Sequence, residues 1–241
     1  MLGPFDYVVW IASFLAELYV VVWALTHRQF LRNISLNIYI LAVALQSIVL
    51  YPLIKHYGAA SLQYRYTYYY TDSLLIILLF FVIMRFYKEM FREMQVGKYV
   101  QGASAMLLTA TALFSYIVIH QNKDHLTSRF VVELGQNLYF VGVVLTYLLW
   151  GAIVKLRETR ARLVQLVLAL GIYFSANAAA YAMRNLFPGL QASVLHFIPP
   201  VMGAFLPIAW AYTLTRIPEK ARLEPARVAA APPHVAVHQH S

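Results

Sequence analysis

The sequence predicts an all-α protein, a seven-transmembrane-helix bundle, and three observations support this prediction. Of the 241 residues, 61% are hydrophobic and 12% are charged, whereas an average soluble domain is about half apolar and about a quarter charged. Seven stretches each carry the roughly 20 mostly apolar residues that a membrane-spanning helix needs. Lys and Arg residues concentrate in alternate loops, as they do in multi-pass membrane proteins. This composition argues against a soluble globular enzyme.

The predicted spans are apolar on every side, as in the run 74–81, so they lack the alternation of outer-membrane barrel strands. Short loops connect them, and consecutive helices should therefore pack antiparallel. Pro199 and Pro200 fall near the start of the last span, where we expect them to break or kink its first turns. The spans cover residues 5–26, 34–54, 66–87, 100–119, 130–154, 162–184 and 193–216.

The placement of basic residues predicts the orientation of the bundle. Most of the 19 Lys and Arg residues lie in the loops after the first, third and fifth spans and in the tail. The positive-inside rule then places the N-terminus outside and the C-terminus in the cytoplasm, as an odd number of spans requires. We expect a multi-pass protein of the cell's inner (cytoplasmic) membrane. The net charge of +9 is explained by loops that meet anionic lipid headgroups, so nucleic acid is not an expected partner.

The two ends of the chain differ in character. No basic residue precedes Arg28 and no small-residue cleavage site is visible, so the first helix is expected to stay in place as a span. Residues 217–241 are rich in Ala, Pro and Arg and should form a disordered cytoplasmic tail. Nothing in the tail resembles a kinase or cyclase domain. A protein partner is instead expected at the cytoplasmic loops 85–98 and 155–162.

Polar side chains near the predicted outer ends of four spans provide the main functional lead. Ionisable side chains inside a bilayer cost about 2.5–3.5 kcal/mol each and usually face the bundle interior or a water-filled cavity. On the third span, Arg65, a tyrosine and Asp72 share one helical face. We interpret these residues as an outward-facing, tyrosine-lined vestibule for a small or lipophilic ligand. Its candidate residues are Arg65, Tyr68, Tyr69, Asp72, Glu133, Gln136, Asn137, Asn177, Tyr181, Arg184 and His196.

A simpler interpretation of the third span remains open. Arg65 could reach toward Asp72 from the membrane interface while the tyrosines form an aromatic belt.

On the fifth span, Phe140 is expected to share the vestibule face with Glu133, Gln136 and Asn137.

Glu17 lies near the middle of the first span, and Gln46 lies at a comparable depth on the second. A carboxyl group at this depth either carries a proton or is paired with a donor such as Gln46. The first possibility suggests a proton-carrying or gating acid, and the second a hydrogen bond between helices.

Several chemistries are not supported. Cys is absent, and the histidines lack the spacing of a metal site. Haem is not an expected cofactor, because no histidines face each other within the predicted spans. A covalent retinal needs a lysine in the last span, which has none. Hydrolase, metalloprotease and nucleotide-binding motifs are missing. We therefore expect that the protein binds no cofactor and is not an enzyme.

The stretch 57–72, continuing to 85–91, resembles a family of small seven-helix integral membrane proteins of acidobacterial type. The segment 129–133 and the following Gln136 are similar to the fifth helix of that family. Its pattern has an acid early in the third helix, expected as Glu, where this chain has Asp72. The resemblance implies the seven-helix architecture and no assigned function.

Three classes of function follow from these features. We place first a receptor-like sensory module that binds a ligand in the vestibule and signals through a cytoplasmic partner. A small proton-coupled transporter and a structural subunit of a larger membrane complex are the alternatives.

Overall fold

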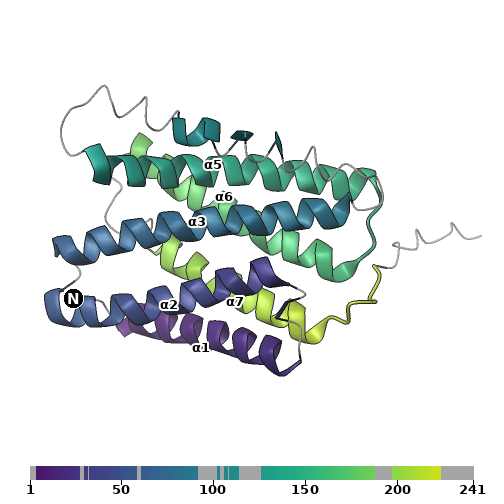
Figure 1. Cartoon of the computed structure of the whole chain (residues 1–241), viewed down its shortest axis with the longest axis horizontal. Helices are drawn as coiled ribbons and strands as arrows, with labels where there is room; N and C mark the ends of the chain where they lie inside the picture. The colour runs from purple at the N-terminus through teal and green to yellow at the C-terminus, as the bar shows by residue number, and fades with distance from the viewer. Residues whose placement is uncertain are drawn as a thin grey trace, which may run out of the picture.

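The computed structural model describes residues 4–27, 30–31, 33–58, 61–91, 102–103, 106–107, 109–113, 126–187 and 197–223. These residues are helical throughout, apart from connecting segments and one isolated bridge pair. The named helices are α1 (Pro4–Thr26), α2 (Ile34–Tyr57), α3 (Leu62–Met90), α5 (Leu126–Lys155), α6 (Ala161–Leu186) and α7 (Ile198–Arg216) (Figure 1).

Among the described residues, six helices are long and apolar enough to cross a membrane, and they correspond to six of the seven predicted spans. The fourth predicted span, 100–119, lies largely outside the described residues. Within it, residues 102–103, 106–107 and 109–113 are helical, and these pieces lie beside α5 (Figure 1). The all-helical prediction is therefore confirmed for the described part of the chain.

The long helices form a closed ring. Each packs against the next helix along the chain, with α3 contacting α5, and α7 packs back against α1. The described chain begins at one end of the bundle and leaves α7 at the opposite end (Figure 1). Because the ring closes, residues of all six long helices contribute to one hydrophobic core.

The start of α7 differs from our expectation of a broken or kinked first turn. The helix begins at Ile198, with proline in its first positions. A proline there loses no helical hydrogen bond, because the first N–H groups of a helix have no partner within it. Pro199 and Pro200 therefore begin the helix instead of distorting it.

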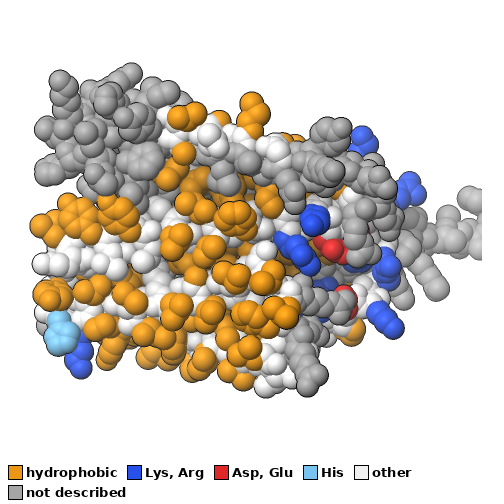
Figure 2. Space-filling model, in the orientation of Figure 1, with side chains coloured by type: hydrophobic (Ala, Val, Ile, Leu, Met, Phe, Trp, Pro, Cys, Tyr) orange, Lys and Arg blue, Asp and Glu red, His pale blue; other side chains and the backbone are white. Residues whose placement is uncertain are grey.

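Large apolar side chains fill the interior and also cover the outside. Phe80, Phe174 and Trp210 are almost completely buried. Many Leu, Val, Ile and Tyr side chains of α1 and α2 are instead exposed, and Figure 2 shows apolar side chains spread along the length of the bundle. An apolar outer surface of this extent fits a lipid environment.

The charged residues gather at one end. In Figure 2, most of the visible Lys and Arg side chains lie at the end where α7 stops. This asymmetry agrees with the sequence prediction that the basic loops lie on one side of the bundle. The described Lys and Arg residues near this end are Arg85, Lys88, Lys155, Arg157, Arg160, Arg162, Arg216, Lys220 and Arg222.

At this end Arg160 forms a cluster with two acids. Its guanidinium group donates hydrogen bonds of 3.0 Å to Glu89 Oε1 and 2.7 Å to Glu158 Oε2. The backbone N–H of Arg160 also donates to Glu158 Oε1, at 2.8 Å. This Arg160 cluster (Glu89, Glu158 and Arg160) fastens the end of α3 to the α5–α6 connection.

The segment after α7 is attached to the same connection. Leu223 N donates to Thr159 O at 2.7 Å, and Ala161 N donates to Ala221 O at 3.1 Å. These bonds flank the bridge pair formed by Arg160 and Arg222. The predicted tail therefore begins with residues, 217–223, that are held against the bundle, while 224–241 lie outside the described residues.

The Arg160 cluster predicts a dependence of stability on pH. Hydrogen bonds from Arg160 hold the pKa of Glu158 below its ordinary value of 4.5. A carboxyl group with a lowered pKa stabilises the folded state above that ordinary value, and this contribution is lost as pH falls through the lower folded-state pKa. We therefore expect the thermal midpoint of the wild type to fall more steeply below pH 4.5 than that of Glu158→Gln. Equal slopes in the wild type and Glu158→Gln would contradict the prediction.

Candidate functional site

Asp72 of α3 lies among tyrosine side chains of three helices. Its carboxyl group is half-buried, and the Tyr139 hydroxyl of α5 lies near it. Tyr68, one turn earlier on α3, and Tyr173 and Tyr181 of α6 also lie near the carboxyl group. In the described part of the chain, no Lys or Arg forms an ion pair with Asp72. Asp72 is thus a carboxyl group with several phenol groups near it.

The tyrosines also contact one another. The hydroxyl oxygens of Tyr139 and Tyr173 are 3.3 Å apart, and the rings of Tyr139 and Tyr181 are 5.4 Å apart between centroids. Tyr39 of α2 lies near Tyr173. We call these residues, Asp72 with Tyr39, Tyr68, Tyr139, Tyr173 and Tyr181, the tyrosine site.

One glycine of α5 lets a neighbouring helix pack closely beside this site. A Cβ atom built at Gly142 would overlap the ring of Phe174 on α6. One at Gly135 would lie 3.5 Å from Ser73 Oγ of α3, which is an ordinary van der Waals contact. Tyr139 lies between these two glycines along α5, and its ring is 6.1 Å from that of Phe174 between centroids. Gly142 thus allows α5 to pack closely on α6 near Tyr139.

The structure places the predicted vestibule residues in different environments. Asp72, Tyr68 and Tyr181 belong to the tyrosine site, and the buried Asn177 donates a 2.8 Å hydrogen bond to Tyr173 O on its own helix. Arg65 and Arg184 are exposed, and in the described part of the chain Arg65 forms no ion pair with Asp72, unlike in the simpler interpretation. Glu133, Gln136, Asn137 and Tyr69 are half-buried on α5 and α3. His196 lies outside the described residues.

Three residues of the site, Tyr39, Tyr139 and Tyr173, are absent from the sequence-based list. On α5, Tyr139 faces inward, whereas Phe140 is 39% exposed. The buried positions 135, 138, 139, 142, 146, 149 and 153 repeat at helical spacing. The small residues Gly135, Gly142 and Thr146 in this series are the signal that could have identified the face. Tyr39 has no such signal, because its role depends on a contact with another helix.

The two polar residues at mid-depth do not pair with each other. Gln46 Nε2 donates to Thr71 Oγ1 at 2.8 Å, so the possible bond from Gln46 to Glu17 is not formed. Glu17 is 1% exposed and accepts a 2.7 Å hydrogen bond from Ser13 Oγ. Tyr39 also lies near Glu17. Tyr39 therefore has both Glu17 and Asp72 as neighbours.

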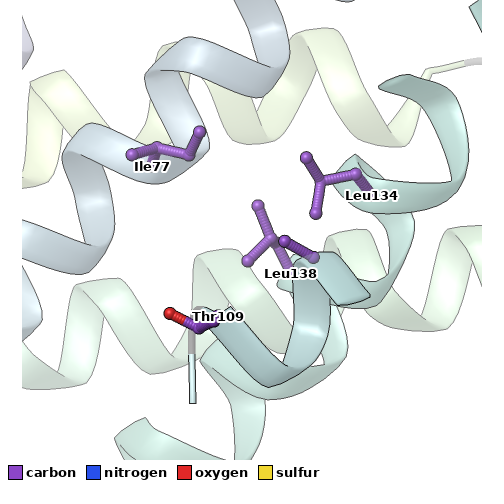
Figure 3. Close-up of a pocket in the computed structure, with 5 residues that line it drawn as sticks. Ile77, Thr109, Leu134 and Leu138 are labelled. Carbon is purple, nitrogen blue, oxygen red and sulfur yellow. The ribbon is translucent and has the colours of Figure 1, made fainter. Parts of the chain in front are cut away.

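A separate hollow of about 330 Å³ lies between α3, α5 and the helical piece 109–113 (Figure 3). Its described lining is apolar apart from the hydroxyl of Thr109, so it offers little beyond van der Waals contacts. The lining residues are Ile77, Thr109, Ala112, Leu134 and Leu138.

No protein-family model, curated protein or solved structure matches this chain. The assignment of a function therefore depends on the chemistry of the tyrosine site. Aromatic rings attract cations over their faces, and a carboxylate accepts hydrogen bonds and attracts positive charge. Together these groups are suited to a ligand that carries a positive charge or several hydrogen-bond donors. Among the described residues, no group of three or more His, Cys, Asp or Glu side chains is placed to hold a metal ion.

Proposed function

We propose that this protein is a receptor-like, non-enzymatic membrane module whose tyrosine site binds a small amine. The observation that carries the proposal is the placement of Asp72 among tyrosines without an ion-pair partner in the described chain. A protonated amine would supply the missing positive charge and would also interact with the ring faces. Desolvated cation–π contacts contribute about 2 kcal/mol, which supports binding of an amine over a neutral molecule of the same size.

In the proposed topology the N-terminus lies outside and the C-terminus lies in the cytoplasm of a bacterial inner membrane. The tyrosine site would then open toward the outside, because the basic end of the bundle lies at the opposite end. The Arg160 cluster would lie on the cytoplasmic side, within the loops where we expect a protein partner. Ligand-dependent movement of α3 or α6 would reach this partner directly, since both helices contribute to the tyrosine site and run to the basic end.

The proposal predicts ligand-dependent stability. An amine at about 100 times its Kd should stabilise the purified protein by about 2.7 kcal/mol, measured by thermal unfolding in detergent. Asp72→Asn removes the charge but keeps the size of the side chain, and should weaken amine binding about 10- to 100-fold, since a hydrogen bond to a charged group contributes about 1.5–3 kcal/mol. Tyr139→Phe should also weaken binding.

Matched variants distinguish a site effect from a loss of folding. Tyr147→Phe removes a hydroxyl from the same helix at a position that is 64% exposed, and should bind as the wild type does. Carboxylates of the same size should not stabilise the protein. Equal stabilisation of the wild type and Asp72→Asn by every amine in the panel would overturn the proposal.

A proton-coupled transporter is the second candidate, and one observation favours it. Tyr39 lies near both Glu17 and Tyr173 and thereby connects the second buried acid to the tyrosine site. Buried acids of this kind line proton paths in pumps and transporters. Amine uptake into proteoliposomes that depends on a pH gradient would favour this candidate over a receptor.

A further inference from the structure

Glu17 belongs to a second polar cluster, formed by α1 and α7. Ser13 Oγ lies 2.7 Å from Glu17 Oε1 and 3.3 Å from Gly203 O of α7. The carboxyl group of Glu17 is 1% exposed, and its Oε2 atom has no hydrogen-bond partner in the described structure. A buried polar oxygen without a partner is costly, so its retention needs an explanation.

Pro207 explains why Gly203 contributes a carbonyl oxygen. In an α-helix the N–H of each residue donates to the carbonyl four residues earlier. Pro207 lies four residues after Gly203 within α7 and has no N–H to donate. The carbonyl of Gly203 is thereby released from its helical bond and faces Ser13 of α1.

The cluster contains more acceptors than donors. Both carboxylate oxygens of Glu17 and the carbonyl oxygen of Gly203 accept hydrogen bonds, whereas the Ser13 hydroxyl supplies a single proton. Interrupted helices that present free carbonyls beside a buried acid are a known arrangement for binding sodium ions or protons within membranes. The ionisable neighbour that α2 places beside Glu17 is Tyr39. In the sequence of α7, the ionisable side chains are the exposed Tyr212 and Arg216.

From this geometry we propose that Glu17, Ser13 and the Gly203 carbonyl form a binding site for a sodium ion between α1 and α7. One carboxylate charge would balance the charge of the ion, and the hydroxyl and carbonyl oxygens would replace part of its water shell. The site shares no ligand with the tyrosine site, so the proposal does not depend on the function proposed above.

The test uses the full chain purified in detergent at pH 8, with NaCl replacing choline chloride at constant ionic strength. At ten times its Kd, sodium should raise the folding equilibrium constant about 11-fold, which for a chain of this size is a rise in thermal midpoint of about 3–5 °C. Binding of radioactive sodium by equilibrium dialysis provides a second readout that does not depend on unfolding.

Three substitutions test the contribution of each proposed sodium ligand. Glu17→Gln should abolish the sodium effect. Ser13→Ala should weaken it, and Pro207→Ala should also weaken it by restoring an N–H that can occupy the Gly203 carbonyl. Pro52→Ala, which changes a proline inside α2, and Asp72→Asn should leave it intact. If Glu17→Gln does not fold, sodium binding by Ser13→Ala and Pro207→Ala, measured by dialysis, tests the site instead. An equal midpoint in sodium and choline, or undiminished sodium binding in these variants, would overturn the proposal.

Discussion

Replacing Trp210 with alanine is expected to destabilise the bundle by on the order of 3 kcal/mol, at the lower end of the range for aromatic-to-alanine changes in cores. The indole of Trp210 is completely buried and donates a 3.3 Å hydrogen bond from Nε1 to Leu166 O of α6. Its ring also meets the edge of Tyr39, at a centroid distance of 5.7 Å. Lipid is as apolar as a protein core, so the cost comes from the cavity and the lost packing more than from transfer into water.

The measurement is the free energy of unfolding in mixed micelles, with Tyr212→Ala as the control. Tyr212 lies two residues away on α7 and is 61% exposed, so its truncation should cost far less. Trp210→Phe should fall between the two, because it keeps a ring but loses the hydrogen bond to Leu166. A loss in Trp210→Ala no larger than in Tyr212→Ala would show that this residue does not anchor α7 to α2 and α6.

The second large effect is expected at Gly142. A methyl group at this position would overlap the ring of Phe174, which is itself completely buried. Overpacking of this kind costs about 1–3 kcal/mol, because α5 and α6 must separate or the ring must leave its position. Since the Phe174 ring packs against Tyr139, Gly142→Ala should also disturb the hydroxyl that lies near Asp72.

Gly151→Ala is a matched control on the same helix. No atom lies within 4 Å of a Cβ built at Gly151, so the substitution should stabilise α5 by about 0.5–1 kcal/mol through its helix propensity. The two glycine substitutions are therefore expected to differ in sign. Unfolding measured by circular dichroism in detergent compares them, and equal effects would argue against close packing of α5 on α6.

Local sequence patterns predict the helices well and their contacts poorly. The predicted spans 34–54 and 162–184 agree with α2 and α6 to within a few residues, because hydrophobicity over a window of about 20 residues is a local property. The effect of Pro199 and Pro200 on α7 depends on whether they lie in the first turn of the helix or beyond it. The predicted span began at residue 193, whereas the helix begins at Ile198. The sequence pattern could not fix that boundary.

The tyrosine site illustrates the same limit. Asp72 and Tyr181 were expected from the cost of placing polar groups in a bilayer. Tyr39 and Tyr139 were not, because a tyrosine is unremarkable in a membrane helix until its neighbours are known. Of the two possibilities left open for Glu17, the hydrogen bond from Gln46 is not formed, because equal depth on adjacent helices does not specify rotation about the helix axis.

The attachment of residues 217–223 to the α5–α6 connection has a practical consequence. A fluorescent protein or an affinity tag joined directly after Arg216 would replace the strand-like pairing of Ala221 and Leu223 with foreign residues. It would then report on a bundle that has lost a stabilising strap at its basic end. A fusion point beyond Leu223 keeps this strap and still leaves the reporter on the same side of the membrane.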